Sequence, residues 1–372
     1  MRLAPLPDWQ SVGARVALAR RTLGLTQAEL AARVQLGRSV LAKVESGARQ
    51  LSALELTALA RATGLPIDWF VAESPPAVTS HRTGSYGAST IVDVRVDVLV
   101  RDVTQLIEMG LLRTDAERPD LRVPRDVEGA EVAALAVRTH LEADAERPID
   151  LAAAAERLGV FAYSLALPQS DVDGGYVALD GQLGVALING AQPSARRRYT
   201  LAHEIGHHVF QDEYAVDVAA TGRSETERII DAFAIHLLLP RVTLTDRWRE
   251  LDGDDEPRTA ALTIGAEYRV SWTALCAQLI NLGIVDRFQG ESIRETTPVG
   301  GEYAELGIDI AEELNAPSVP RGVARAVISG YRSHRLGPGR TLELLHGTLD
   351  EADLPGRHVV PRDAIAGELR SL

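Results

Sequence analysis

Apolar positions near the amino terminus recur at helical spacing. Val12, Val16 and Ala19 follow one another every three or four residues, and similar short sets continue to residue 70 without the alternation of a strand. The pattern predicts a group of short helices over residues 9–70. Residues 74–90 are rich in Pro, Ser, Thr and Gly and have too few apolar side chains to pack, so we expect a linker there.

Residues 91–110 fit two patterns. Valines at every second position from 92 to 100 suit a strand. A 4-3-4-3-4 spacing instead suits a helix with one continuous apolar seam, formed by Val92, Val96, Leu99, Val103, Leu106 and Gly110. We favour the helix, because the pattern outlasts strands of about 3–10 residues. Such a seam would either pair two copies of the chain or cover the next domain.

From residue 129 onward, helical and strand patterns alternate. Strands are expected over 160–167, 175–179 and 183–188, and helices near 129–142, 150–158, 200–211, 225–239 and 257–283. The order, strands followed by helices, predicts an α+β fold. A polar segment at 289–302 suggests a further boundary, and the residues after it have helical patterns without recognisable chemistry.

These patterns divide the 372 residues into four parts, slightly more than the two or three domains that this length suggests. We predict an all-α domain over 1–71, a linker and connecting helix over 72–128, an α+β domain over 129–288, and a helical C-terminal region over 289–372 whose role the sequence does not indicate.

Composition narrows the class of protein. The net charge is −13, but residues 1–71 carry nine basic and five acidic side chains, a net charge of +4, which leaves −17 for the rest. One basic module therefore precedes an acidic body. The single cysteine, Cys276, excludes an internal disulfide framework and a cysteine-rich metal cluster. No apolar stretch resembles a signal peptide or a membrane helix, so we expect a cytoplasmic protein.

The motif His203-Glu204-Ile205-Gly206-His207 carries the clearest chemistry. On a helix, residues four apart lie on one face, so both histidines can bind one tetrahedral metal ion while Glu204 reaches a metal-bound water. This is the HExxH arrangement of zinc peptidases. Glu204 would act as general base toward the water that attacks a peptide carbonyl, and then as acid toward the leaving amine.

A catalytic metal needs a third protein ligand, for which Glu227 is the candidate. Asp231 follows four residues later and would orient a ligand histidine from behind. Alternatively, Ser224 and Glu227 fit a capping box, in which Glu227 only caps its own helix. Other acidic residues could then serve as ligands, namely Glu213, Asp217 and Glu225.

Two features of substrate binding are less defined. An extended peptide could pair with an edge strand, for which the 183–188 segment is a candidate. The group that stabilises the oxyanion is not assigned, and the side chains that we consider are Arg198, His208 and Tyr214.

Residues 25–47 have the pattern of a helix-turn-helix. Thr26 and Glu29 form a capping box at the start of its first helix, and Gly47 ends the second. The second helix of this motif enters the major groove of DNA with its N-terminal side chains facing base edges. We therefore expect a structural role for Glu45 and DNA contacts from Gln27, Arg38, Ser39 and Lys43.

The motifs resemble two known families. Residues 9–70 resemble XRE/Cro-type repressor domains through LTQAELAARV and SVLAKVESG, and residues 130–285 resemble the ImmA/IrrE family of bacterial zinc metallopeptidases. The second resemblance rests on RRRYTLAHEIGHHVF, ETERIIDAFAIHLLLP and YRVSWTALCAQLINLGIV. Carried over by position, it implies His203, His207 and Glu227 as metal ligands and Glu204 as the general base, although Ile230 stands where Ala is common in the family.

The resemblance implies a regulatory endopeptidase of the bacterial cytoplasm. It would hold one Zn²⁺ per chain, bind double-stranded operator DNA through residues 1–71 as a homodimer, and cleave a protein, either a transcriptional repressor or a toxin–antitoxin partner. Stress-response, prophage or mobile-element genes would be controlled in this way. The alternative is a non-proteolytic XRE-type regulator or antitoxin in which the metal is structural.

Overall fold

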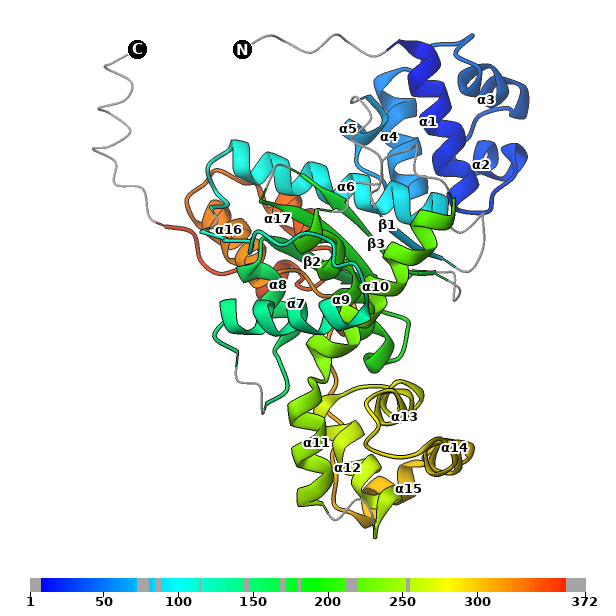
Figure 1. Ribbon diagram of the computed structural model, residues 1–372. Coiled ribbons are helices and arrows are strands. Elements are labelled where there is room, and N and C mark those ends of the chain that lie inside the picture. The colour runs from blue at the N-terminus through cyan, green and yellow to red at the C-terminus, as the bar shows by residue number, and fades with distance from the viewer. Residues whose placement is uncertain are drawn as a thin grey trace.

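The computed structural model describes residues 8–71, 80–83, 89–113, 115–143, 147–167, 172–179, 182–211, 220–251 and 255–358. Three apolar clusters organise them. One lies within the N-terminal helices, and the other two lie on opposite faces of a four-stranded sheet (Figure 1). The prediction of a helical N-terminal domain followed by an α+β region and C-terminal helices is confirmed.

The N-terminal helices are α1 (Trp9–Thr22), α2 (Gln27–Arg33), α3 (Arg38–Glu45), α4 (Ala53–Thr63) and α5 (Ile67–Val71). The predicted capping box is present at α2, where Thr26 and Glu29 cap each other's backbone N–H groups. A Cβ on Gly13 would lie 2.2 Å from the carbonyl oxygen of Val44, so only glycine lets α1 pack this closely against α3. Arg20 pairs with Glu45 at 2.6 Å and ties α1 to α3, which confirms the structural role of Glu45.

The sheet consists of β1 (Ser80–Thr83), β2 (Val160–Leu165), β3 (Val172–Ala178) and β4 (Gly184–Asn189) in the order β1-β3-β4-β2. β2 and β4 are parallel, whereas β3 is antiparallel to both β4 and β1. The three predicted strands are confirmed. β1 was not predicted, because its four residues within the expected linker lack an apolar pattern, and pairing with β3 holds them instead.

The helices α7 (Val127–His140), α8 (Leu151–Arg157), α9 (Ser194–Phe210) and α10 (Ala220–Leu238) cover one face of the sheet. The other face packs against α6 (Ser89–Glu108), α16 (Arg321–Arg332) and α17 (Pro338–Leu344), and a 3₁₀ turn follows at Glu351–Asp353. The C-terminal helices therefore complete the apolar core of the sheet, a role that their own sequence did not reveal.

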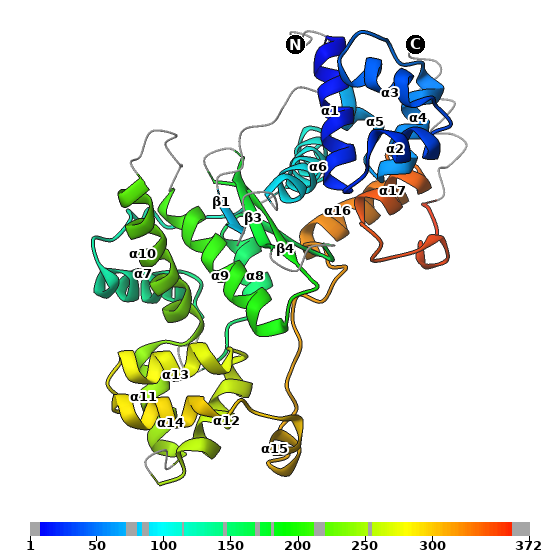
Figure 2. The same cartoon turned by 90° about the vertical axis from the view of Figure 1, so that its right-hand side faces the viewer.

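The position of helix α6 confirms the helical prediction for residues 91–110 and shows which surface its apolar seam contacts. Of the predicted seam, the apolar residues from Val92 to Leu106 are buried against the sheet. Val94 and Val98 point the other way and join the core of the N-terminal helices. Figure 2 shows α6 between these two parts of the molecule. The seam covers the next domain and is not available to pair two copies of the chain.

A separate helical group follows α10. It contains α11 (Arg241–Glu250), α12 (Pro257–Tyr268), α13 (Trp272–Asn281), α14 (Arg287–Glu295) and α15 (Gly300–Glu305) (Figure 1). The predicted helical segment 257–283 is thus confirmed as two helices. The boundary expected at 289–302 stays a prediction, although α14 and α15 occupy these residues and α14 packs on α13 so closely that a Cβ on Gly290 would meet Ile280 at 2.3 Å.

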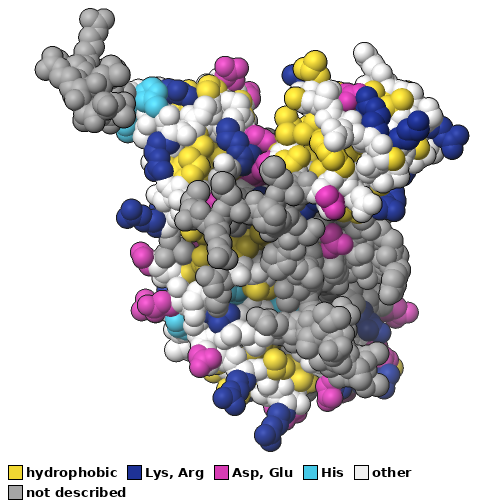
Figure 3. All heavy atoms as spheres, turned by 90° about the horizontal axis from the view of Figure 1, so that it is seen from above, with side chains coloured by type: hydrophobic (Ala, Val, Ile, Leu, Met, Phe, Trp, Pro, Cys, Tyr) yellow, Lys and Arg dark blue, Asp and Glu magenta, His cyan; other side chains and the backbone are white. Residues whose placement is uncertain are grey.

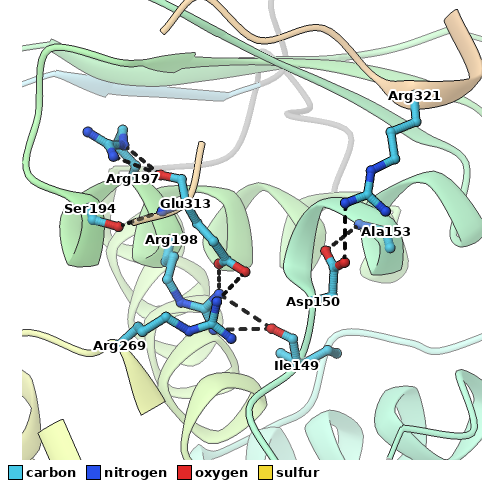
Figure 4. A network of polar contacts seen from close by, with 9 residues as sticks. All are labelled: Ile149, Asp150, Ala153, Ser194, Arg197, Arg198, Arg269, Glu313 and Arg321. Atoms are coloured by element: carbon cyan, nitrogen blue, oxygen red, sulfur yellow. Dashed lines mark hydrogen bonds and ion pairs between the residues drawn. The ribbon is translucent and has the colours of Figure 1, made fainter. Parts of the chain in front are cut away.

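The 306–320 segment returns the chain from this group to the sheet. Glu313 forms ion pairs with the buried Arg198 and with Arg269, and the three side chains point toward one another in Figure 4. Ser318 pairs with Ser164 of β2 through two backbone hydrogen bonds. Burial lowers the pKa of Arg198 to about 9, so the guanidinium stays charged at neutral pH and needs the Glu313 carboxylate.

Among the described residues, no helix has both the length and the apolar character needed to cross a membrane.

Candidate metal centre

Helix α9 carries the HExxH motif through the interior of the molecule. Every residue from Thr200 to Phe210 is buried, so each polar side chain on this stretch needs a partner inside the protein. Thr200, Glu204 and His208 are spaced four apart and share one face, which lies against the sheet. His203 and His207 share a neighbouring face, which lies toward α10. α9 therefore presents two polar faces to two different layers.

His203, His207 and Glu227 form one cluster, in which one ligand atom from each lies within 4.8 Å of the others. The two imidazole Nε2 atoms are 3.1 Å apart. Glu227 extends from α10, with Oε2 3.2 Å from Nε2 of His203 and Oε1 3.9 Å from Nε2 of His207. The three residues named from the sequence are thus brought together by the packing of α9 on α10.

These distances fit a metal ion. In a tetrahedral site with bonds of about 2.0–2.1 Å, neighbouring ligand atoms lie roughly 3.3 Å apart. Two imidazole nitrogens and a carboxylate are also a donor set that divalent metals such as zinc prefer. The residues present therefore fit a divalent cation bound by His203, His207 and Glu227.

Asp231 lies behind His203, as its spacing from Glu227 predicted. Its Oδ1 is 3.0 Å from Nδ1 of His203 and 3.1 Å from the hydroxyl of Tyr199. A proton on Nδ1 donated to this carboxylate leaves Nε2 of His203 as the ligand atom. The role of Tyr199 was missed, although its position four residues before His203 places it on the same face of α9.

Glu204 has a different environment from the three clustered residues. It is fully buried, and neither of its carboxylate oxygens has a hydrogen-bond partner among the described residues. Burying an ionised carboxylate without a partner costs several kcal/mol. The protein keeps this group beside the cluster without satisfying it, as expected for a residue that acts on a bound water or substrate.

His208, the third histidine of α9, belongs to the sheet. Its Nε2 donates to the carbonyl oxygen of Leu158 at 2.7 Å, and its Nδ1 accepts from the hydroxyl of Tyr176 at 2.7 Å. Burial lowers the pKa of His208 to about 4, so the ring is neutral at neutral pH. Burial likewise raises the pKa of Tyr176, and the negative charge of Glu204 adds to that effect. His208 is a packing residue of α9.

The structure decides between several alternatives. α10 begins at Ala220, so Ser224 lies inside the helix and the capping-box interpretation of Glu227 is wrong. Glu225 is exposed and outside the cluster, whereas Glu213, Asp217 and Tyr214 lie outside the described residues.

Two of the candidates for stabilising an oxyanion are engaged elsewhere. Arg198 is fully buried, and its guanidinium binds Glu313 and the carbonyl oxygen of Ile149. His208 is held by Tyr176 and Leu158 as described. Neither side chain is therefore available to a substrate.

The predicted DNA-contacting residues lie on α2 and α3. Arg38, Ser39 and Lys43 are exposed on α3, while the side chain of Gln27 donates to Glu45 at 2.8 Å and is half-buried. Figure 3 shows Lys and Arg side chains gathered at the outer edge of the N-terminal helices. Three of the four candidates are therefore free to meet a phosphate or base, and Gln27 is held inside the domain.

Two family models match the chain. A helix-turn-helix model matches residues 16–70, and a peptidase model described as the IrrE N-terminal-like domain matches residues 155–279. No curated protein matches the chain. Both resemblances drawn from the sequence motifs are confirmed: a helix-turn-helix DNA-binding domain precedes a metallopeptidase-like domain. The peptidase match contains α9 and α10 with the whole cluster and ends within α13.

We predict that one divalent metal ion binds per chain and that His203→Ala and Glu227→Ala each weaken its affinity by two orders of magnitude or more. Asp231→Asn should weaken it roughly 10–100-fold, because His203 loses the carboxylate that orients it. Elemental mass spectrometry measures the metal content of each variant, and titration against a chelator measures its affinity for the metal. Glu225→Ala is the matched control, exposed two residues away on the same helix. An equal loss in this control would contradict the assignment of Glu227.

Gly206 sets the distance between α9 and α10. A Cβ there would lie 2.8 Å from Cγ2 of Ile230 and 3.1 Å from Cδ1 of Phe233. Gly206→Ala should push α10 outward, weaken metal binding through Glu227 and destabilise the fold by about 1–3 kcal/mol. Gly265→Ala on α12 is the control, because its Cβ would meet only Leu275, at 3.4 Å. Thermal unfolding and metal titration of both variants test this, and equal effects would refute it.

Proposed function

We propose that this protein is a DNA-binding zinc endopeptidase that controls gene expression by hydrolysing a peptide bond in a protein substrate, such as a transcriptional repressor or a toxin–antitoxin partner. The observation that carries the proposal is the environment of Glu204. A purely structural metal site needs three or four ligands and no additional carboxylate, yet Glu204 is buried beside the ligands with no hydrogen-bond partner among the described residues. The two family matches support the same combination of activities.

Each residue of the site has a distinct task in this reaction. Bound zinc would polarise the substrate carbonyl and lower the pKa of its water to about 7. Glu204 takes the proton of the attacking water on its carboxylate and passes it to the leaving amine. Asp231 and Tyr199 hold His203 in the orientation in which Nε2 faces the cluster.

DNA recognition is assigned to α3. Arg38 and Ser39 begin this helix and Lys43 lies further along it, all exposed. Arginine and lysine in these positions suit phosphate and guanine contacts in the major groove. We further propose a homodimer, since proteins of this class read two half-sites. The seam of α6 is buried inside the chain, so the dimer must use another surface.

The peptidase activity is tested with Glu204→Gln. We expect the variant to bind metal and fold as the wild type does and to lose at least a thousandfold in cleavage, because no other buried carboxylate among the described residues adjoins the ligands. A proteome-derived peptide library with mass-spectrometric identification of new termini provides the assay without a known substrate. Equal cleavage by wild type and Glu204→Gln, or none by a wild type that holds zinc, would favour the non-proteolytic regulator instead.

DNA binding is tested with Arg38→Ala and Lys43→Ala in selection from random-sequence duplexes. We expect each variant to lose about 1–3 kcal/mol of affinity for the enriched duplex, with a weaker dependence on salt. Arg61→Ala is the control, because Arg61 is an exposed arginine on α4, outside the two-helix motif of residues 25–47. A loss only in the control would contradict the placement of α3 in the groove.

A further inference from the structure

The edge of the sheet that could receive a peptide is already occupied. The 183–188 segment suggested as an edge strand forms β4, which lies between β3 and β2 and has no free edge. β3 would be the edge strand, but β1 pairs with it antiparallel, with Ser80 opposite Tyr176 and Arg82 opposite Gly174. The outermost strand is thus a segment from between the DNA-binding helices and α6.

The register places the middle of β1 at the level of the catalytic residues along α9. A Cβ on Gly174, which is opposite Arg82, would lie 3.0 Å from Cγ2 of Thr200. Tyr176, which is opposite Ser80, reaches His208 with its hydroxyl. Glu204 lies between Thr200 and His208 on the same face of α9. The middle of β1 therefore lies at the level of the stretch of α9 from Thr200 to His208, which contains Glu204.

β1 also lies on the side of α9 that carries the metal ligands. His208 donates to the carbonyl oxygen of Leu158, just before β2. The face of α9 that carries Thr200, Glu204 and His208 meets β3 at Gly174 and Tyr176. His203 and His207 are rotated from that face by roughly 80° toward α10. In the sheet, β1 is on the side of β3 away from β2. Figures 1 and 2 both show β1 at the end of the sheet nearest α10. Cα atoms of β1 and α9 approach within 8 Å.

We propose that β1 is bound as a substrate and that the chain hydrolyses its own backbone within Ser80–Thr83. Extended peptides bind proteins by adding a strand to a sheet edge, and β1 does this beside the general base. Water adds across one peptide bond, so that one fragment ends in a carboxylate and the other begins with an amine. This inference rests on the proposed peptidase function and names a substrate for it.

Such a cut would uncouple the two functional parts of the chain. The residues before it contain the five N-terminal helices, whereas α6 and the metal centre follow it. After the cut, only non-covalent contacts hold the parts together, including the ion pair of Arg15 with Asp97 at 3.3 Å and the packing of Val94 and Val98. Self-cleavage would convert a permanent attachment into one that can dissociate.

The test uses the full-length protein purified with a chelator and then given zinc. Intact-mass spectrometry should show two fragments whose junction falls within residues 80–83, formed at a rate that does not change over a hundredfold dilution. Glu204→Gln should remain intact. His81→Pro should slow the cut at least tenfold, because proline cannot donate to the ladder, and should raise cleavage of the peptide library by freeing the edge of β3.

Hydrogen–deuterium exchange gives a readout that does not depend on activity. In metal-free Glu204→Gln, amides of residues 172–176 should exchange more slowly than in the double variant with His81→Pro, because β1 covers them. Equal exchange in the two proteins would show that β1 does not cover the edge of β3, and it would overturn the proposal.

The remaining outcomes separate the two proposals. A wild type that cuts the library but stays intact overturns self-cleavage and leaves the peptidase function standing. A wild type that binds zinc and cuts neither overturns both. Cleavage whose rate rises with protein concentration overturns the intramolecular reaction, and so does an unchanged cut in His81→Pro.

Discussion

The burial of a polar helix is the constraint on which the rest of this structure depends. α9 runs through the core with arginines, histidines and a glutamate at positions that have almost no contact with solvent. Each such group must be paired inside the protein, and the partners come from every layer: Glu313 from the 306–320 segment, Asp231 from α10, and Tyr176 from β3. Among the residues that the structure describes, the carboxylate of Glu204 has no such partner, and the proposed chemistry is assigned to it for that reason.

This constraint also explains why segments far apart in the sequence build one body. Arg197 and Arg198 at the start of α9 bind the 306–320 segment, so the helical group before it and α16 and α17 after it are held in place. α16 and α17 then close the second face of the sheet together with α6. Helix α9 is therefore supported by residues more than a hundred positions away.

Helix α6 packs against both the helix-turn-helix domain and the metallopeptidase-like domain. One face of α6 packs on the sheet, and the other contributes valines to the N-terminal core, while the buried Asp97 pairs with Arg15 and Arg101. A buried ion pair with hydrogen bonds fixes orientation more than it adds stability. The N-terminal helices are thus docked on the body in one orientation, and β1 passes from them to the sheet edge.

Motifs with a local physical cause could be predicted from the sequence. Histidines four residues apart share a helix face, a capping box starts α2, and the spacing of Glu227 and Asp231 places both carboxylates on one side of α10. The helix-turn-helix, the strands of the body and the metal ligands followed from such patterns. Tyr199 could have been found by the same spacing rule, four residues before His203.

What the sequence alone determined is the identity of the reactive groups, because periodicity and spacing act within one element. Only the tertiary structure decided which groups are paired and which are not. In the folded chain, His208 and Arg198 bind partners inside the core, Gln27 donates to Glu45, and β1 pairs with the edge of β3. These contacts join residues 18 to about 115 positions apart, and no local pattern encodes a partner at that distance, since pairing depends on how whole elements pack.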